Sequence, residues 1–255
     1  MTKTVSISNR KGGVGKTATA HALGAGLIQR GYKVLFVDLD SQCNLTDALG
    51  VDKGSVEASS LDVLEGSSTA SEAILKTEGG DLLPASPELA KADRIIDGVG
   101  SEYKLKEALQ SISRRYDYII IDTPPALGVL TVNALTASNK VIIPAQADLY
   151  SLQGIEQLYG TIGAVQLFTN KKLKTDGILI TRYSGRSIIS RDYKDNLEEV
   201  AKLIETKVYK TPIRECIAVR EAQATHTDIF SYASRSNAGK DYKAFIDEFL
   251  GGTSK

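Results

Sequence analysis

The sequence has no excess of charge of either sign, because its 31 lysine and arginine residues balance 31 aspartate and glutamate residues over 255 positions. This balance excludes a uniformly basic nucleic-acid-binding protein. Apolar residues make up 42% of the chain and charged residues 24%, the ordinary mixture of a globular protein. A single hydrophobic core stops growing near about 250–300 residues, so we expect one domain spanning residues 1–255.

Cysteine is scarce, since only Cys43 and Cys216 occur and no Cys-x-x-Cys pair is present. This excludes a disulfide framework and a structural zinc site, and it suits a reducing compartment. Long apolar runs are also lacking: none approaches the roughly 18–20 residues that cross a bilayer, and the first residues lack the apolar segment of an export signal. We therefore expect a cytoplasmic protein without a membrane partner.

Short β-branched runs alternate with longer helical patterns along the chain. The runs are continuously apolar, which is typical of buried strands in a parallel sheet, and the alternation predicts an α/β fold with a doubly wound, mostly parallel sheet flanked by helices. The expected strands are Thr4–Ser8, Lys33–Val37, Tyr118–Ile121, Lys140–Pro144 and Gly177–Thr181. The expected helices are Thr17–Arg30, Glu102–Arg115, Ser151–Phe168, Ser187–Glu205 and Asn237–Leu250. Residues 53–100 are less regular and predict short helices and exposed connections.

The first expected strand leads into a glycine-rich string at the start of a helix. Glycines let consecutive backbone N–H groups converge on an anion, and the helix N-terminus adds its dipole. Lys16 can reach the outer phosphates of a nucleotide, and the Thr17 hydroxyl can bind Mg²⁺. The strict G-x-x-x-x-G-K-[ST] pattern fails, because Arg10 stands at its first glycine. The predicted cofactor-binding residues are Lys11, Gly12, Gly13, Val14, Gly15, Lys16, Thr17 and Ala18.

Three aspartates follow two of the apolar strands. Asp38 and Asp40 come after the second strand, and Asp122 ends the run Ile119-Ile120-Ile121. In a parallel sheet these carboxylates emerge at the edge that carries the phosphate loop. Three acids facing one polyphosphate imply a divalent cation, so Mg²⁺ is expected with ATP or ADP. The alternative for each aspartate is a helix N-cap or a turn residue.

The string K-G-G-x-G-K-T resembles the deviant Walker A box of the ParA/MinD family of ATPases. The resemblance implies that Lys11 crosses a dimer interface to the partner's nucleotide. It implies that Lys11, Lys16 and Asp40 are catalytic, and that Asp40 orients the attacking water. It also implies that Thr17, Asp38 and Asp122 hold the metal. The segment Asp38–Asn44 is similar to the family's D-x-D-P-Q-G-N, with serine and cysteine replacing proline and glycine.

Further segments resemble the ParA/Soj partition branch over nearly the whole chain. Ile213–Ala222 is similar to the family's I-P-R-N-V-x-L-x-E-A segment, which borders the adenine, with Arg214 replacing proline and Cys216 replacing asparagine. The resemblance places Arg214 and Cys216 beside the nucleotide, and an ordinary loop is the alternative at these positions.

Neutral total charge hides an asymmetry between the two parts of the chain. Residues 1–150 hold 15 basic and 18 acidic side chains, a net −3, whereas residues 151–255 hold 16 and 13, a net +3. A modest basic face in the second part could bind DNA phosphates without sequence preference, and a solvated surface of mixed charge is the alternative. The candidate DNA-binding residues are Arg186, Arg191, Arg214, Arg220, Arg235 and Lys240.

The resemblance therefore implies a ParA-type partition ATPase. Such a protein forms an ATP-bound homodimer, binds non-specific double-stranded DNA on the nucleoid, and meets a ParB-like protein that stimulates its slow hydrolysis. Two alternatives stay open from the sequence: a MinD-like ATPase recruited to membranes by its terminal helix, and a nucleotide-gated DNA-binding module with very slow hydrolysis. The mixed charge of the helix expected at Asn237–Leu250 favours packing against the domain over membrane binding.

Overall fold

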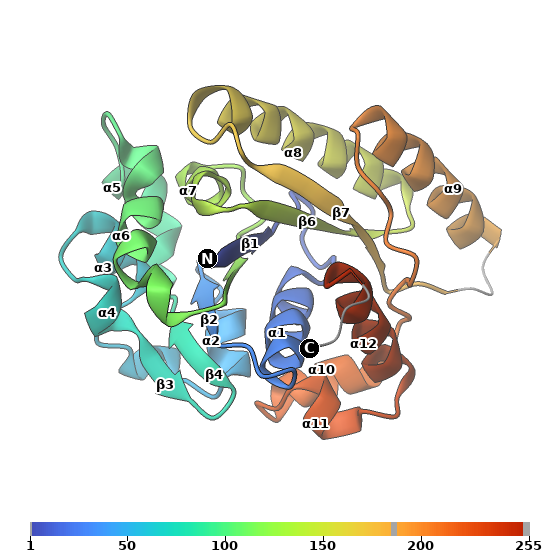
Figure 1. The fold of residues 1–255 in the computed structure, drawn as a ribbon, viewed down its shortest axis with the longest axis horizontal. Helices are drawn as coiled ribbons and strands as arrows, with labels where there is room; N and C mark the ends of the chain where they lie inside the picture. Colours follow the sequence, from blue (N-terminus) through green and yellow to red (C-terminus); the bar gives the residue numbers. More distant parts are fainter. Residues whose placement is uncertain (1, 185–187, 252–255) are drawn as a thin grey trace.

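A computed structural model describes residues 2–184 and 188–251 (Figure 1). The described residues form one seven-stranded sheet in the order β3-β4-β2-β5-β1-β6-β7, in which only the β3–β4 pair is antiparallel. The strands are β1 (Lys3–Ile7), β2 (Val34–Asp38), β3 (Leu75–Thr77), β4 (Gly80–Leu83), β5 (Tyr118–Asp122), β6 (Lys140–Gln146) and β7 (Lys174–Thr181). The predicted mostly parallel α/β sheet is confirmed, with all five expected strands present.

Helices follow most strands and connect them. The α-helices are α1 (Lys16–Ile28), α2 (Asn44–Ala48), α3 (Ser60–Glu65), α4 (Ala70–Ala73), α5 (Ala92–Ile95), α6 (Lys104–Ile112), α7 (Val129–Ala137), α8 (Leu149–Phe168), α9 (Ile188–Leu203), α10 (Ile217–Ala224), α11 (Ile229–Ala233) and α12 (Asn237–Phe249). Short 3₁₀ turns are η1 (Lys53–Ser55), η2 (Pro87–Lys91), η3 (Ser101–Tyr103) and η4 (Ser113–Arg115). Among the described residues, no helix is long and apolar enough to span a membrane.

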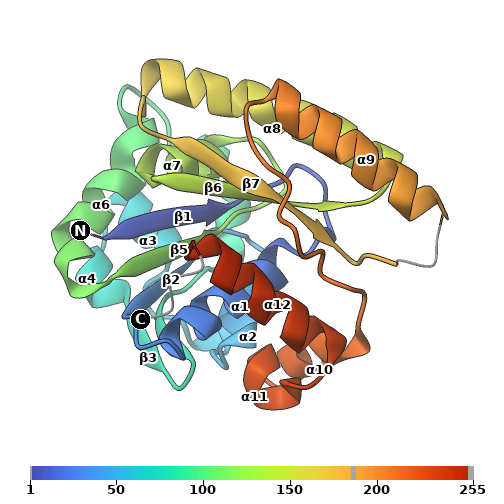
Figure 2. The same cartoon turned by 45° about the vertical axis from the view of Figure 1, so that its right-hand side comes forward.

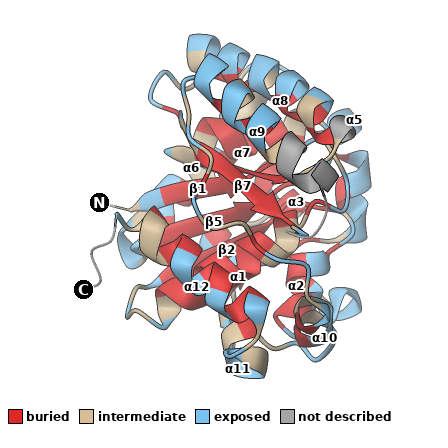
Figure 3. Ribbon diagram, turned by 90° about the vertical axis from the view of Figure 1, so that its right-hand side faces the viewer, coloured by how far each residue is buried: buried red, intermediate tan, exposed pale blue. Residues whose placement is uncertain are grey.

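Successive residues of each strand point to opposite faces of the sheet, and helices cover both faces. The strands are therefore apolar throughout. Val34 and Phe36 of β2 pack with α1 and α12, whereas Leu35 and Val37 pack with α3, α6 and α7. A third cluster joins β6 and β7 to α8 and α9. Figure 2 shows α8 and α9 on one side of the sheet and α1, α10, α11 and α12 on the other, and Figure 3 shows the buried strands between them.

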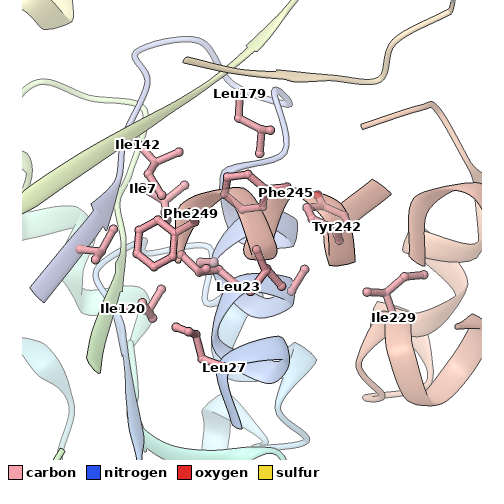
Figure 4. Packing of buried hydrophobic residues seen from close by; sticks show 14 of the residues in the cluster. Ile7, Leu23, Leu27, Ile120, Ile142, Leu179, Ile229, Tyr242, Phe245 and Phe249 are labelled. Carbon is pink, nitrogen blue, oxygen red and sulfur yellow. The ribbon is translucent and has the colours of Figure 1, made fainter. Parts of the chain in front are cut away.

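The last helix is built into the core. Phe245 and Ile246 are fully buried and Phe249 is 9% exposed, and they pack with Leu23 and Leu27 of α1 (Figure 4). Tyr242 on the same helix is 2% exposed. The prediction that this helix packs against the domain is confirmed, because its apolar face is already covered.

Several boundaries and elements differ from the sequence prediction. The helix expected at Glu102–Arg115 is interrupted, since η3 precedes α6 and η4 follows it. The expected start of α9 at Ser187 lies outside the described residues. The β3–β4 hairpin and the helices α7, α10 and α11 were not predicted as elements. The hairpin strands have three and four residues, too few to produce a clear alternation of apolar and polar side chains.

Candidate nucleotide-binding site

The phosphate loop lies between β1 and α1, as the sequence predicts. Gly13 and Gly15 adopt left-handed conformations with φ of 73° and 84°, and Gly15 caps the N-terminus of α1. A Cβ atom placed on Gly12 or Gly13 would meet no heavy atom within 4 Å. The backbone at these glycines is therefore open to a ligand. It lies at the N-terminus of a thirteen-residue helix, where the helix dipole favours anions.

Side chains at the ends of β1, β6 and β7 hold the phosphate loop in place through hydrogen bonds. The Asn9 amide nitrogen donates to the Pro144 carbonyl at 2.6 Å, and the Gln146 amide donates to the Gly13 carbonyl at 3.1 Å. The Thr181 hydroxyl, at the end of β7, donates to the Val14 carbonyl at 2.7 Å. These bonds preorganise the loop, which reduces the conformational cost of binding an anion.

Lys16 and Thr17 begin α1 beside the acids that the sequence predicts to hold a metal. Lys16 is 7% exposed, and its Nζ donates to the Lys11 carbonyl at 3.2 Å. Burial lowers the pKa of Lys16, while Asp122 and Asp40 oppose that shift. The Thr17 hydroxyl donates to Asp122 Oδ2 at 2.6 Å. The structure thus brings together Lys16, the Thr17 hydroxyl and the Asp122 carboxylate, which the sequence predicts for one site.

Asp122 has a carboxylate oxygen that a bound cation could contact. It is fully buried, stands opposite Ile7 of β1 and Asp38 of β2 in the sheet register, and its Oδ1 has no hydrogen-bond partner. Burial raises its pKa well above the ordinary value, and Asp38 adds to the shift. A buried carboxylate oxygen without a partner is costly, so the residues here fit a divalent cation held by Asp122 and Thr17.

Among the described residues, no group of three or more His, Cys, Asp or Glu side chains is arranged to hold a metal ion by itself.

Asp38 has a different set of contacts from the one expected of a metal ligand. Its Oδ1 accepts from the Asp40 N–H at 3.0 Å, and its Oδ2 accepts from the N–H and hydroxyl of Thr46 at 2.9 and 2.8 Å. Burial raises the pKa of Asp38 to about 6 in spite of these bonds. In the structure Asp38 therefore holds the following loop to α2, and a metal contact at this residue stays a prediction.

Asp40 and Cys43 belong to this loop. Asp40 is 8% exposed, faces the cavity described below, and accepts from the Gln42 N–H at 3.1 Å. Cys43 is fully buried and has φ of 56°, a left-handed conformation that is uncommon for a residue with a side chain. The cysteine thus keeps the backbone shape that glycine would adopt and adds a side chain to the core.

A cavity of about 570 Å³ runs from the phosphate loop to the C-terminal helices. Of the predicted site residues, it is lined by Gly12, Gly13, Gly15, Lys16, Thr17, Ala18, Asp40, Arg214 and Cys216. Lys11, Val14, Asp38 and Asp122 do not belong to its lining, and the last three are buried behind it. Lining residues that the sequence analysis did not assign to a site include Thr181, Val219, Gln223 and Tyr242.

Residues 213–216, which we call the strap, border the cavity opposite the phosphate loop. Arg214 makes an ion pair with Asp241 of α12, with Nη2 at 2.7 Å from Oδ1, and Glu215 pairs with Arg182 at 2.9 Å. Arg214 and Cys216 therefore lie where the resemblance implies, beside the cavity. Asp241 was not singled out, because no pattern links it to a residue 27 positions earlier.

Lys11 lies at the outer rim of the phosphate loop. Its Nζ makes an ion pair with Asp148 and donates to the Gln146 side chain at 3.3 Å. Asp148 also caps α8 by accepting from the Ser151 N–H at 2.9 Å. The two lysines of the loop are thus separated: Lys16 lines the cavity, and Lys11 is held outside the lining.

The candidate DNA-binding residues are not all described. Arg186 and the side chain of Arg191 lie outside the described residues. Arg214, Arg220, Arg235 and Lys240 are exposed. Arg214 and Arg220 also line the cavity, so these two side chains lie at the candidate nucleotide-binding site.

A parallel sheet whose first strand leads into a glycine-rich loop and helix, with a buried aspartate at the end of the neighbouring strand, defines a P-loop nucleotide-binding protein. A family model described as an AAA domain matches residues 2–175. Sporulation initiation inhibitor protein Soj of Bacillus subtilis is 41% identical over 245 residues, covering 95% of this chain and 96% of the relative. The chain therefore belongs to the ParA/MinD family of P-loop ATPases.

Other similar proteins agree with this assignment. Chromosome partitioning protein ParA of Myxococcus xanthus is 34% identical, covering 96% of this chain and 87% of the relative. A Mycobacterium smegmatis structure described as cobyrinic acid a,c-diamide synthase, with bound ADP and magnesium, is 37% identical with a TM-score of 0.86 and covers 100% of this chain and 98% of that one. The septum site-determining protein MinD of Pyrococcus horikoshii, complexed with Mg-ADP, is 26% identical with a TM-score of 0.79, covering 100% of this chain and 99% of that one.

Proposed function

We propose that residues 1–255 act as one ParA-type DNA-partition ATPase that hydrolyses ATP to ADP and phosphate with Mg²⁺. The relatives named as partition proteins and those solved with ADP and magnesium support this proposal. The observation that carries it is the separation of the two lysines, since Lys16 lines the cavity while Lys11 stands outside the lining, paired with Asp148. A lysine outside the lining supports a role on the nucleotide of a second copy of the chain.

Each residue of the site has a definite task in this function. The loop backbone and Lys16 bind the phosphates, and Thr17 and Asp122 bind the cation, with Asp38 holding the adjoining loop close to it. The cation would neutralise charge on the phosphates. Asp40 faces the cavity and accepts a proton or a hydrogen bond from the attacking water, while Lys11 from the partner copy stabilises the transferred phosphoryl group.

Non-specific DNA binding follows ATP-dependent dimerisation. Two copies would place two modest basic surfaces on one duplex, and the number of phosphates neutralised sets both the affinity and its salt dependence. We assign this surface to exposed residues of the C-terminal part, including Arg220, Arg235 and Lys240. A ParB-like partner would stimulate hydrolysis and release the dimer, and the protein would act in the cytoplasm on the nucleoid.

The proposal is tested by retention on non-specific double-stranded DNA at matched salt with ATP, ADP or no nucleotide. We expect retention only with ATP, with a loss in Lys16→Ala because phosphate contacts are removed. Equal retention in all three conditions would refute the nucleotide switch.

A second measurement separates hydrolysis from binding. Asp40→Ala is expected to keep ATP and DNA binding and to lose turnover in a single-turnover assay. Unchanged turnover in that variant would refute the role given to Asp40. No turnover in the wild-type protein, together with ATP-dependent DNA binding, would instead indicate a nucleotide-gated binding module.

A further inference from the structure

The strap passes between β7 and α12, in the orange segment that leads to α10 in Figure 2. Its main chain is bonded to the end of β7: the Ile213 N–H donates to Ile180 at 2.7 Å, and the Tyr183 N–H donates to Ile213 at 2.9 Å. The Glu215 N–H donates to Tyr183 at 3.2 Å. One side of the strap is therefore fixed by backbone hydrogen bonds to the sheet.

The other side of the strap is fixed by one carboxylate of α12. Asp241 Oδ2 accepts from the Arg214 N–H at 3.0 Å and from Arg214 Nε at 2.8 Å, and Oδ1 accepts from Nη2 at 2.7 Å. The Asp241 side chain is 7% exposed and that of Arg214 is 45% exposed. A bidentate arginine–carboxylate pair is a strong and directional contact, and the poorly hydrated carboxylate depends on it.

The ion pair on the neighbouring residue has a different character. Arg182 and Glu215 pair at 2.9 Å, but their side chains are 53% and 54% exposed. Exposed pairs of this kind contribute about 0–1 kcal/mol, because water screens them and ordering the side chains costs entropy. The strap is therefore held to α12 through Arg214 and Asp241. Asp247, another carboxylate of α12, pairs with Arg30 outside the cavity lining and offers a matched control.

The strap lines the part of the cavity that phosphates do not occupy. With phosphates at the glycine loop and Lys16, the remaining part of the lining, which includes residues 213–216 and Val219 of α10, would receive the nucleoside. A proline at position 214, as in the family pattern, lacks the N–H and the side chain that form these three bonds. The connection between the strap and α12 is thus a feature of this chain's own residues.

We propose that Asp241 is a positioning residue for nucleotide retention: through Arg214 it holds the strap against the nucleoside, and it thereby sets how fast a bound nucleotide leaves. This inference rests on the proposed nucleotide-binding function. Release of the strap from α12 opens the nucleoside end of the cavity and leaves the phosphate loop unchanged.

The test is the dissociation rate of ADP carrying a ribose-linked N-methylanthraniloyl fluorophore, measured by stopped flow with excess ADP and Mg²⁺. Asp241→Asn and Arg214→Gln are expected to accelerate release about tenfold, which corresponds to about 1.4 kcal/mol. Asp247→Asn, on the same helix as Asp241 but outside the cavity lining, is expected to change the rate less than twofold. Inorganic pyrophosphate, which contacts only the phosphate loop, is expected to compete with equal affinity in all four proteins.

The outcomes separate three cases. Equal release rates in the wild type and both variants would overturn the role of Asp241. A parallel loss of ADP and pyrophosphate affinity, with a lower Tm in both variants, would also overturn it, because the pair would then support the whole fold. Absence of labelled-ADP binding to the wild-type protein would refute the proposed function itself and the inference with it.

Discussion

The two ends of the cavity are constructed in different ways. The phosphate end is formed by residues 11–18, contiguous in sequence, and it is held by hydrogen bonds from side chains at the ends of β1, β6 and β7. The nucleoside end is formed by the strap and α10, and it depends on a side-chain pair between Arg214 and Asp241. The phosphate end is thus preorganised by several side chains of the sheet. The strap at the nucleoside end is bonded to the end of β7 by its backbone, but its connection to α12 depends on a side-chain pair that one substitution can remove.

The largest expected effect comes from breaking the phosphate end. Lys16→Ala removes the positively charged side chain that lines the cavity beside the glycine loop. Hydrogen bonds to charged groups contribute about 1.5–3 kcal/mol each. We expect nucleotide affinity to fall about 100-fold, measured by isothermal titration calorimetry with ADP and Mg²⁺. Arg10→Ala, an exposed residue outside the cavity lining, is the control. An unchanged Kd in Lys16→Ala would contradict the assignment of the phosphate site.

A smaller effect is expected from substitutions of Thr46, whose hydroxyl helps to hold the loop that carries Asp40. The Thr46 hydroxyl donates to Asp38 and accepts from the Ala85 N–H at 2.9 Å. Thr46→Val keeps the shape of the side chain and leaves both groups without this partner, which costs about 1–3 kcal/mol of unfolding free energy. Thr46→Ser retains the hydroxyl and is expected to recover most of the loss. Urea denaturation measures both, and an unchanged unfolding free energy in Thr46→Val would contradict the role given to the hydroxyl.

The smallest effect at neutral pH is expected at Cys43. Burial, together with Asp38, raises the pKa of its thiol from 9.0 to about 11. The unfolded chain therefore releases this proton at lower pH than the folded protein, so that unfolding free energy falls as pH rises from 9 to 11. Cys43→Ala lacks this titration and is expected to show a shallower fall, measured by urea denaturation across that range. The same slope in both proteins would contradict the shift.

The phosphate end was predictable because its chemistry is local. The glycines, Lys16 and Thr17 follow one strand, and Asp122 ends another apolar run, so a parallel sheet alone brings them to one edge. The contacts of Asp38 were not predictable in the same way. Its hydrogen bonds to Thr46 depend on how the chain folds back into α2, eight residues later, and the sequence pattern does not specify that path.

The nucleoside end shows the limit of sequence patterns more clearly. Arg214 and Cys216 were placed near the nucleotide by resemblance, and both line the cavity. The partner of Arg214 stands in a different helix, and an isolated aspartate in an amphipathic helix gives no sign of such a role. The six buried residues of the nine in α7 include Thr131, Asn133 and Thr136, so this helix likewise lacks the one-sided apolar pattern that marks a helix in sequence.

The strap has one more consequence, for how copies of this chain can meet. Its hydrogen bonds to Ile180 and Tyr183, together with those of Lys207 and Tyr209 to Ile178, occupy backbone groups along the outer side of β7. These groups would otherwise be an open template for another strand. At the opposite border of the sheet, β3 has only three residues. Short or covered borders disfavour strand-to-strand association between molecules. Crowded copies of this chain are therefore protected from joining their sheets into aggregates.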